Sequence, residues 1–382
     1  MLAYRDPAER RLTVLQTLPD MHSGGVERGV VEVGDALAAA GHRSIVVSAG
    51  GPMVARLEAG GSEHVEMPIG RKSPATLRCV PKLRDLCVRE GVDVLHARSR
   101  VPAWVALLAW RSCPAALRPR LVTTMHGLHS VGTFSSVMTR GERVIAVSRT
   151  VRDHILENYP GCPESRITVI PRGVDPDAMP YGHLPDDGWI DAFLAEFPRL
   201  RRRRLVTLAG RLTRLKGHFD FLDVIERSAE DVHGLIVGGE DPKRRAYAEE
   251  LRGAVRDRGL SGRVTLTGHR PDVREVLAVS DVVVSLSTKP ESFGRAVLES
   301  LSLGRPVVGY DHGGVGEVLA DLFPEGRVPL GDTAAAADRV ADLIEHGAVP
   351  GPVFGYELDA MLDAVLGVYE SMATPARRPV AA

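Results

Sequence analysis

The segment KPESFGRAVLE, residues 289–299, combines two carboxylates, a glycine and a change from strand to helix pattern. It follows the apolar run VVVSLS (282–287), which is typical of a buried strand, and a helix is expected to begin near Gly294. Ligands in open α/β sheets bind at the carboxyl ends of strands, where such a loop lies. The unpaired N–H groups at a helix N-terminus bind anions. The segment is therefore predicted to hold a phosphate group.

The side chains of this segment point to a sugar nucleotide rather than to a phosphate alone. The turn formed by Ser292, Phe293 and Gly294 is expected to seat a diphosphate, because glycine allows close approach to the backbone. Glu291 and Glu299 stand on either side of that turn, and carboxylates accept hydrogen bonds from sugar hydroxyls. Either glutamate alone would be read as an ordinary surface charge. The combination of strand, turn, glycine and both carboxylates favours the site.

A second basic motif, GRLTRLKG (210–217), follows another apolar strand. Arg211 and Lys216 are five residues apart in a strand-to-helix loop, so both side chains could reach one ligand. A guanidinium offers a bidentate fork and an ammonium offers a point charge, and a diphosphate leaving group needs such neutralisation. Ordinary surface basicity is the alternative reading of this motif.

Two weaker motifs follow strands in the first half of the chain. Gly24 and Gly25 lie at a strand-to-helix turn, where paired glycines permit tight backbone approach to a ligand. His126 ends a strand beside a glycine in TTMHG, although a lone histidine is more often structural, and His129 is nearby. The glycine pattern is not G-x-G-x-x-G, which disfavours an NAD site.

PESFGRAVLESLSLGRPVVG (290–309) resembles the signature of retaining glycosyltransferases of family four, which have the GT-B fold. The resemblance implies that Glu291 contacts the donor sugar, that Glu299 holds the ribose, and that Arg211 and Lys216 neutralise the diphosphate. It also places His126 near the donor sugar and the glycine loop at 24–25 near the donor phosphates. The usual glycine after the first glutamate is replaced here by a serine, which could tune the fit of the donor sugar.

Further matches extend the resemblance over residues 12–372. His269 and Arg270 lie in GHR (268–270), where the family reads the base largely through backbone groups. The phrases LPDMHSGGVERG, LHARSRVPAW and GRLTRLKG are similar to a bacterial subgroup associated with lipopolysaccharide core assembly. A set of basic residues is predicted to bind an anionic acceptor. These residues are Arg71, Lys72, Arg98, Arg100 and Arg172.

The elements that position these residues alternate between short apolar runs and helical patterns, which predicts parallel sheets covered on both faces. The fold class is therefore α/β, with two Rossmann-like domains facing across a cleft. The expected divisions are an acceptor-binding domain (1–174), a linker (175–190), a nucleotide-sugar-binding domain (191–355), a crossover helix packing on the first domain (356–372) and a disordered tail (373–382).

Composition restricts the class of protein further. The formal net charge is −1, so the chain as a whole does not resemble a nucleic-acid-binding protein. Residues 1–172 nevertheless carry 23 Lys and Arg against 16 Asp and Glu, which favours an anionic partner for that half or merely reflects two solvated surfaces. The four cysteines show no metal-binding spacing and are expected to be reduced. We expect a cytoplasmic protein, in which any membrane contact is peripheral, at the inner membrane.

The sequence therefore predicts a retaining transfer of a sugar from a nucleotide diphosphate to a cell-envelope glycan or glycolipid, such as lipopolysaccharide core. No metal or cofactor is expected. A nucleotide-sugar epimerase or a phosphorylase of the same fold remains open, because fold alone does not exclude them. A non-catalytic nucleotide-sugar-binding subunit of a partner transferase is a third reading, and retention of both glutamates, Arg211 and Lys216 argues against it.

Overall fold

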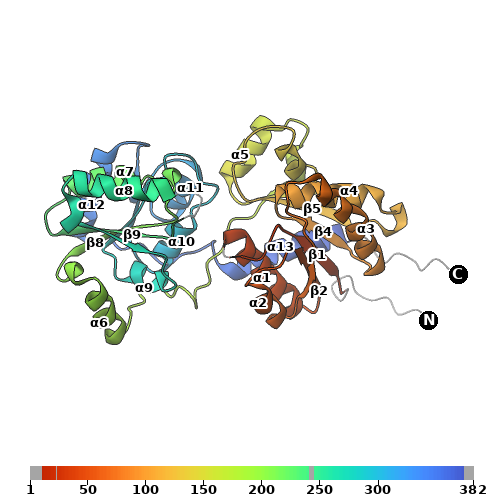
Figure 1. Ribbon diagram of the computed structural model, residues 1–382, viewed down its shortest axis with the longest axis horizontal. Helices are drawn as coiled ribbons and strands as arrows, with labels where there is room; N and C mark the ends of the chain where they lie inside the picture. Colours follow the sequence, from red (N-terminus) through yellow and green to blue (C-terminus); the bar gives the residue numbers. More distant parts are fainter. Residues whose placement is uncertain (1–10, 23, 241–244, 374–382) are drawn as a thin grey trace. The chain divides into compact units, whose positions relative to one another are not determined.

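The computed structural model describes residues 11–22, 24–240 and 245–373, which form two compact units. The first unit contains residues 11–171 together with 360–373, and the second contains residues 172–359. Each unit is an α/β sandwich in which helices cover a parallel sheet (Figure 1). The predicted fold class of two Rossmann-like domains is confirmed.

The sheet of the first unit has seven parallel strands in the described residues, in the order β3-β2-β1-β4-β5-β6-β7. Its strands are β1 (Thr13–Thr17), β2 (Arg43–Ser48), β3 (Glu63–Glu66), β4 (Val94–Ala97), β5 (Arg120–Met125), β6 (Arg143–Ala146) and β7 (Ile167–Val169). The accompanying helices are α1 (Gly25–Ala39), α2 (Val54–Ala59), α3 (Cys79–Arg89), α4 (Arg100–Ser112), α5 (Arg149–Asn158) and α13 (Leu358–Met372). The central strands are buried on both faces, which explains why they read as continuous apolar runs.

The second sheet has six parallel strands in the described residues, in the order β10-β9-β8-β11-β12-β13. Its strands are β8 (Arg204–Ala209), β9 (Val232–Val237), β10 (Val264–Gly268), β11 (Val282–Ser285), β12 (Val307–Tyr310) and β13 (Arg327–Val328). Its helices are α6 (Asp187–Glu196), α7 (His218–Arg227), α8 (Arg245–Asp257), α9 (Val273–Ala278), α10 (Arg295–Ser302), α11 (Gly313–Leu322) and α12 (Thr333–His346). A large apolar core joins this sheet to most of its helices, and a smaller one contains Phe193 of α6.

The last helix belongs to the first unit although the chain reaches it from the second (Figure 1). On α13, the Tyr369 hydroxyl lies 2.7 Å from Nδ1 of His96 on β4, and both side chains are fully buried. The Met372 carbonyl accepts a hydrogen bond from Arg120 at the start of β5. These contacts fix the returning helix against the first sheet, as the sequence predicts for the crossover helix.

The elements differ from expectation mainly where the apolar signal is short. The strands β3, β7 and β13 were not predicted, because each has only two to four residues and little apolar periodicity. The segment 175–190, expected as a linker, lies in the second unit, and its last four residues begin α6 with Asp186 as N-cap. Of the predicted tail, residues 374–382 lie outside the described residues.

All four cysteines are buried and unpaired in the structure. Among the helices of the described residues, none has both the length and the apolar character needed to cross a bilayer.

Candidate functional site

The two main predicted motifs follow the strands at which the order of the second sheet reverses. In this sheet β8 is flanked by β9 and β11, so that chain progression runs outward in opposite directions from the β8–β11 pair. Loops at the carboxyl ends of such a pair diverge and leave a crevice, which is where ligands bind in open α/β sheets. The basic motif at 210–217 follows β8, and the glutamate segment at 289–299 follows β11.

The two motifs meet through a partly buried ion pair. Nζ of Lys216 lies 2.7 Å from Oε1 of Glu291, and the side chains are only 22% and 14% exposed. The hydroxyl of Ser287 donates a hydrogen bond to the same carboxylate oxygen. Ser287 was not predicted, and its position four residues before Glu291 in the post-strand loop was the only available signal. The cation that would neutralise a phosphate is thus held by the carboxylate that would bind a sugar.

Backbone contacts fix the two loops to each other. The N–H of Thr288 donates to the carbonyl of Leu215 at 2.9 Å. Gly217 adopts a left-handed conformation, φ 69°, and a Cβ atom there would lie 1.8 Å from the carbonyl oxygen of Leu286. The glycine that ends the basic motif is therefore required by close packing as well as by its φ angle.

The helix after the predicted phosphate turn begins where the sequence predicts it. Gly294 is the N-cap of α10, with φ 97°, and the helix begins at Arg295. The carbonyl of Glu291 accepts a hydrogen bond from the N–H of Gly314, at 2.8 Å. A Cβ atom on Gly314 would lie 2.4 Å from the Cα of Phe293. The start of α11 at Gly313 and Gly314, which was not among the predicted site residues, therefore packs against the turn.

The other predicted donor-site residues differ in how far their side chains are exposed. Phe293 is only 4% exposed and its ring centroid lies 6.0 Å from that of Tyr356, so its side chain belongs to the core and only its backbone can face a ligand. Glu299 lies on α10, and its Oε1 is 3.8 Å from Nε of Arg295. Arg211 is exposed and forms no ion pair within the part of the chain that the structure describes.

Arg270 does not present its guanidinium to a ligand. It is paired with Asp272 at 2.8 Å and with Glu196 at 2.9 Å, and it lies 5.2 Å from the ring centroid of Phe193. The hydrogen bond that Arg270 donates to Asp272 raises the pKa of this guanidinium above its ordinary value. The Arg270 side chain therefore anchors α6, and the contribution of Arg270 and His269 to the donor site stays a prediction.

In the first unit the weaker motifs occupy the carboxyl edge of the sheet. Gly24 caps α1 after β1, and Gly25 is the first residue of that helix. His126 directly follows β5. Burial lowers the pKa of the neighbouring His129 to about 4, so that this ring is neutral near pH 7. The strand order also reverses between β1 and β4, which places the glycine turn at the switch point of this sheet.

Comparison with known proteins identifies the family. Residues 23–178 match the model for Glycosyltransferase Family 4, and residues 202–346 match the model for Glycosyl transferases group 1. The chain belongs to the family-four glycosyltransferases. A solved glycosyltransferase from Rickettsia africae superposes with a TM-score of 0.81 at 25% identity, covering 96% of this chain and all of that one.

Two curated relatives show how far the similarity extends. The chain is 27% identical to phosphatidyl-myo-inositol mannosyltransferase of Mycobacterium leprae over 374 residues, which cover 92% of this chain and 94% of the relative. It is 30% identical to alpha-maltose-1-phosphate synthase of Mycolicibacterium smegmatis over 242 residues, which cover 60% of each protein. The matched part of this family-four chain therefore spans less than two thirds of that synthase.

The basic residues predicted to bind an acceptor do not form one group in this glycosyltransferase. Arg98 is 2% exposed and donates to Gln16 at 2.6 Å beneath α1, and burial lowers its pKa, so it is not available at the surface. Arg172 is 8% exposed and belongs to the second unit. Both were predicted from charge and position alone, which do not report burial.

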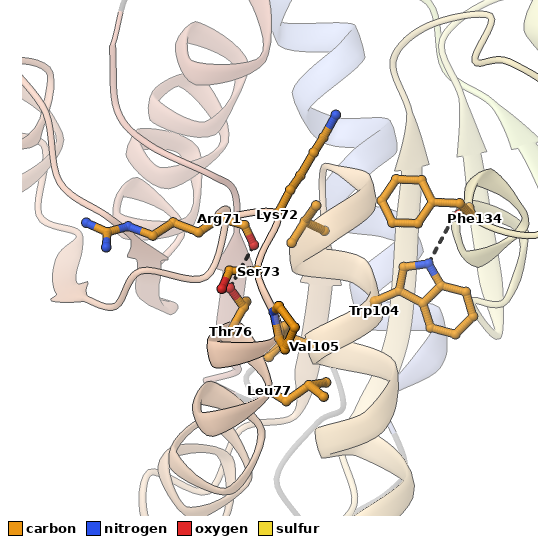
Figure 2. A pocket seen from close by; sticks show the side chains of 10 residues that line it. Arg71, Lys72, Ser73, Thr76, Leu77, Trp104, Val105 and Phe134 are labelled. Atoms are coloured by element: carbon orange, nitrogen blue, oxygen red, sulfur yellow. Dashed lines mark hydrogen bonds between the residues drawn. The ribbon is translucent and has the colours of Figure 1, made fainter.

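Arg71 and Lys72 do line a pocket in the first unit, with a volume of about 580 Å³. Arg100 lies beside it, with its guanidinium 5.6 Å from the ring centroid of Phe134. Figure 2 shows the two basic side chains on one wall and the rings of Trp104 and Phe134 on the other.

Proposed function

We propose that this family-four protein transfers a sugar from a nucleotide diphosphate to an acceptor, with retention of the anomeric configuration. The observation that carries the proposal is the 2.7 Å contact between Lys216 and Glu291. It joins a phosphate-neutralising cation to a sugar-binding carboxylate at the switch point of the second sheet. An epimerase of the same fold would convert the donor without needing an acceptor, and the experiment below separates the two.

The roles of the donor-site residues follow from their chemistry. Arg211 and Lys216, with the N-terminus of α10 at Gly294, would neutralise the leaving diphosphate. Glu291 would accept hydrogen bonds from the donor sugar, and Glu299 from the ribose hydroxyls. Charge that develops on the leaving oxygen meets cations already in place, so little reorganisation is needed during the reaction.

The proposed chemical step is a front-face displacement. The bond between the anomeric carbon and the leaving phosphate oxygen breaks while the acceptor oxygen attacks from the same face. The acceptor proton passes to the leaving phosphate oxygen, and the products are the glycoside and the nucleoside diphosphate. His126 is assigned to orientation of the donor sugar by family resemblance, and no side chain is required as a nucleophile.

The acceptor is proposed to be a phosphate-bearing component of the cell envelope, for example lipopolysaccharide core, met at the cytoplasmic face of the inner membrane. Two observations support an anionic acceptor. The first 172 residues carry seven more basic than acidic side chains. The names of both curated relatives described above include a phosphate group, in maltose-1-phosphate and in phosphatidyl-myo-inositol.

The first test is calorimetric titration of the purified protein with UDP, GDP and ADP. We expect selective binding of one nucleotide, weakened about 10- to 100-fold in Glu299→Ala, because one charge-assisted contact to the ribose is lost. Glu250→Ala is the matched control, since Glu250 lies in the same unit but pairs with the exposed Arg214. If none of the three nucleotides binds, the proposal fails.

The second test uses the sugar nucleotide built on that base. Proton NMR of the product reports whether the anomeric configuration of the donor is retained. Conversion of the sugar nucleotide in the absence of any acceptor would indicate an epimerase, and dependence on free phosphate would indicate a phosphorylase.

A further inference from the structure

The pocket of the first unit is built from segments that follow three strands of its parallel sheet, the edge strand β3 and the adjacent strands β4 and β5. Residues 71–77 come after β3, α4 begins after β4, and Phe134 lies in the segment after β5. The carboxyl ends of parallel strands meet at one edge of a sheet, and this edge is where α/β domains bind ligands. The pocket therefore stands at the functional edge of the first unit, outside the donor motifs of the second.

The lining of the pocket is predominantly apolar. Its apolar side chains come from the short helix at 74–78, from one face of α4 and from the segment after β5. They are Pro74, Leu77, Val101, Trp104, Val105 and Phe134. Leu77 and Phe134 are 56% and 46% exposed, so both present apolar surface to solvent at the pocket.

The shape of this apolar surface is maintained by contacts among its own residues. The indole N–H of Trp104 donates to the carbonyl of Phe134 at 2.9 Å, a bond that Figure 2 shows as a dashed line. The hydroxyl of Thr76 donates to the carbonyl of Arg71 at 2.7 Å, which fixes the opposite wall. A preformed pocket binds with a smaller entropic cost than one that must be assembled around its ligand.

The charge at the edge of the pocket has one sign. Arg71 and Lys72 are exposed, and neither forms an ion pair within the described ranges 11–22, 24–240 and 245–373. In Figure 2 the Arg71 side chain extends away from the rings of Trp104 and Phe134. The lining residues include no aspartate or glutamate. A ligand that complements this surface has an apolar chain and an anionic group attached to one end of it.

We infer that the pocket binds the lipid part of an anionic amphiphile, whose phosphate is held by Arg71 and Lys72. This inference rests on the proposed function in one respect, since it makes that amphiphile the acceptor of the transferred sugar. A chain seated between Leu77 and the Trp104 ring leaves its headgroup at the basic edge. The acceptor is thus a lipid-borne phosphate compound rather than a free sugar phosphate.

Binding of alkyl phosphates in the absence of any sugar nucleotide tests the inference. Hexyl, octyl and decyl phosphate, each kept below its aggregation concentration, are titrated while tryptophan fluorescence is followed. Trp104→Phe identifies the signal of the pocket among the three tryptophans. Each added methylene is expected to tighten binding about fourfold as long as it enters the pocket. Inorganic phosphate and octyl glucoside serve as the probes without a chain and without a charge.

Two pairs of variants give the matched controls. Leu77→Asp is expected to weaken binding of decyl phosphate at least tenfold, whereas Leu117→Asp, at another exposed leucine of the same unit, leaves it unchanged. The double variant Arg71→Ala, Lys72→Ala should remove the preference for octyl phosphate over octyl glucoside, whereas Arg111→Ala should retain it. Because these side chains are exposed, the substitutions are not expected to affect folding.

Several outcomes would overturn the inference. Binding of inorganic phosphate as tight as that of decyl phosphate would reduce the site to a phosphate site. If Leu77→Asp and Leu117→Asp weaken binding of decyl phosphate equally, the pocket is not where the alkyl chain binds. In another outcome, the protein binds anionic vesicles equally well with and without Leu77→Asp and yet binds no single amphiphile in solution. That result would indicate attraction to the headgroup layer only. The titration uses no sugar nucleotide, so its result does not depend on whether the protein transfers a sugar. If the protein glycosylates soluble acceptors but binds no alkyl phosphate, the inference about the pocket is refuted while the proposed function stands.

Discussion

Nζ of Lys216 and Oε1 of Glu291, which are 75 residues apart in the chain, form a 2.7 Å ion pair at the carboxyl edge of the second sheet. Each side chain restricts the position of the other, so the cation is placed before any phosphate arrives. Preorganised charges of this kind supply a large share of catalysis in reactions where a negative charge develops on the leaving group.

Removal of the Lys216 ammonium therefore has a clear expected consequence. In Lys216→Met the leaving diphosphate loses one cation and Glu291 loses its partner, and kcat is expected to fall about 100- to 1,000-fold. Arg214→Ala is the matched control, because Arg214 lies two residues away but is exposed and paired with Glu250. Its activity should stay within about threefold of the parent. Steady-state release of nucleoside diphosphate measures kcat of both variants. An equal loss of kcat in Lys216→Met and Arg214→Ala would show that Lys216 has no specific role in the reaction.

The packing of Gly217 against Leu286 predicts a stability effect. Gly217→Ala would place a methyl group 1.8 Å from the Leu286 carbonyl oxygen, in addition to straining φ. Gly259 has nearly the same φ, 68° against 69°, but no atom within 4 Å of the added methyl group. We expect Gly259→Ala to cost about 1 kcal/mol in free energy of unfolding and Gly217→Ala clearly more, roughly 3 kcal/mol. Urea unfolding of the two variants gives the comparison, and equal costs would contradict the predicted clash.

One buried polar contact contributes to the attachment of α13 to the first unit. In Tyr369→Phe, Nδ1 of His96 loses its partner inside the core, which is expected to cost about 1–3 kcal/mol. Tyr181→Phe is a suitable control, because that hydroxyl donates to a carbonyl from a half-exposed ring. Hydrogen exchange of α13 measures the local effect. Unchanged protection of α13 amides in Tyr369→Phe would show that apolar packing alone fixes the helix.

Two buried histidines predict that acid destabilises the second unit. Burial lowers the pKa of His218 and of His233 from 6.5 to about 4. Between these values the unfolded chain binds protons that the folded chain does not, so stability falls as the pH falls from 6.5 to 4. The loss is on the order of 3 kcal/mol for each histidine at the end of this range.

Urea unfolding between pH 7 and pH 4.5 measures that dependence. His233→Gln retains a donor for Thr265 but does not titrate, and its stability should vary less with pH. His22→Gln, at a largely exposed ring, should keep the slope of the parent protein. If His233→Gln also keeps that slope, the histidine carries its proton in the folded protein and the prediction fails.

The sequence by itself determined the fold class and the main donor motifs. Strands such as β8 and β11 are buried on both faces, so their apolar runs are visible without any tertiary information. Gly217 and Gly294 stand at positions where the chain needs a positive φ, and such positions leave a direct mark on the sequence. The short edge strands left no such mark, because few of their residues are buried on both faces.

Only the tertiary structure decided which charged side chains are available to a ligand. Arg98 and Arg100 are two residues apart in HARSR, yet the first is buried beneath α1 and the second lies beside the pocket of the first unit. Arg270 forms ion pairs with Asp272 and Glu196. A charge in the sequence states what a side chain can bind, whereas its partner and its burial depend on neighbours that folding brings from distant segments. The ion pair of Lys216 with Glu291 and the apolar pocket beside Lys72 are products of that folding, and the sequence motifs alone do not contain them.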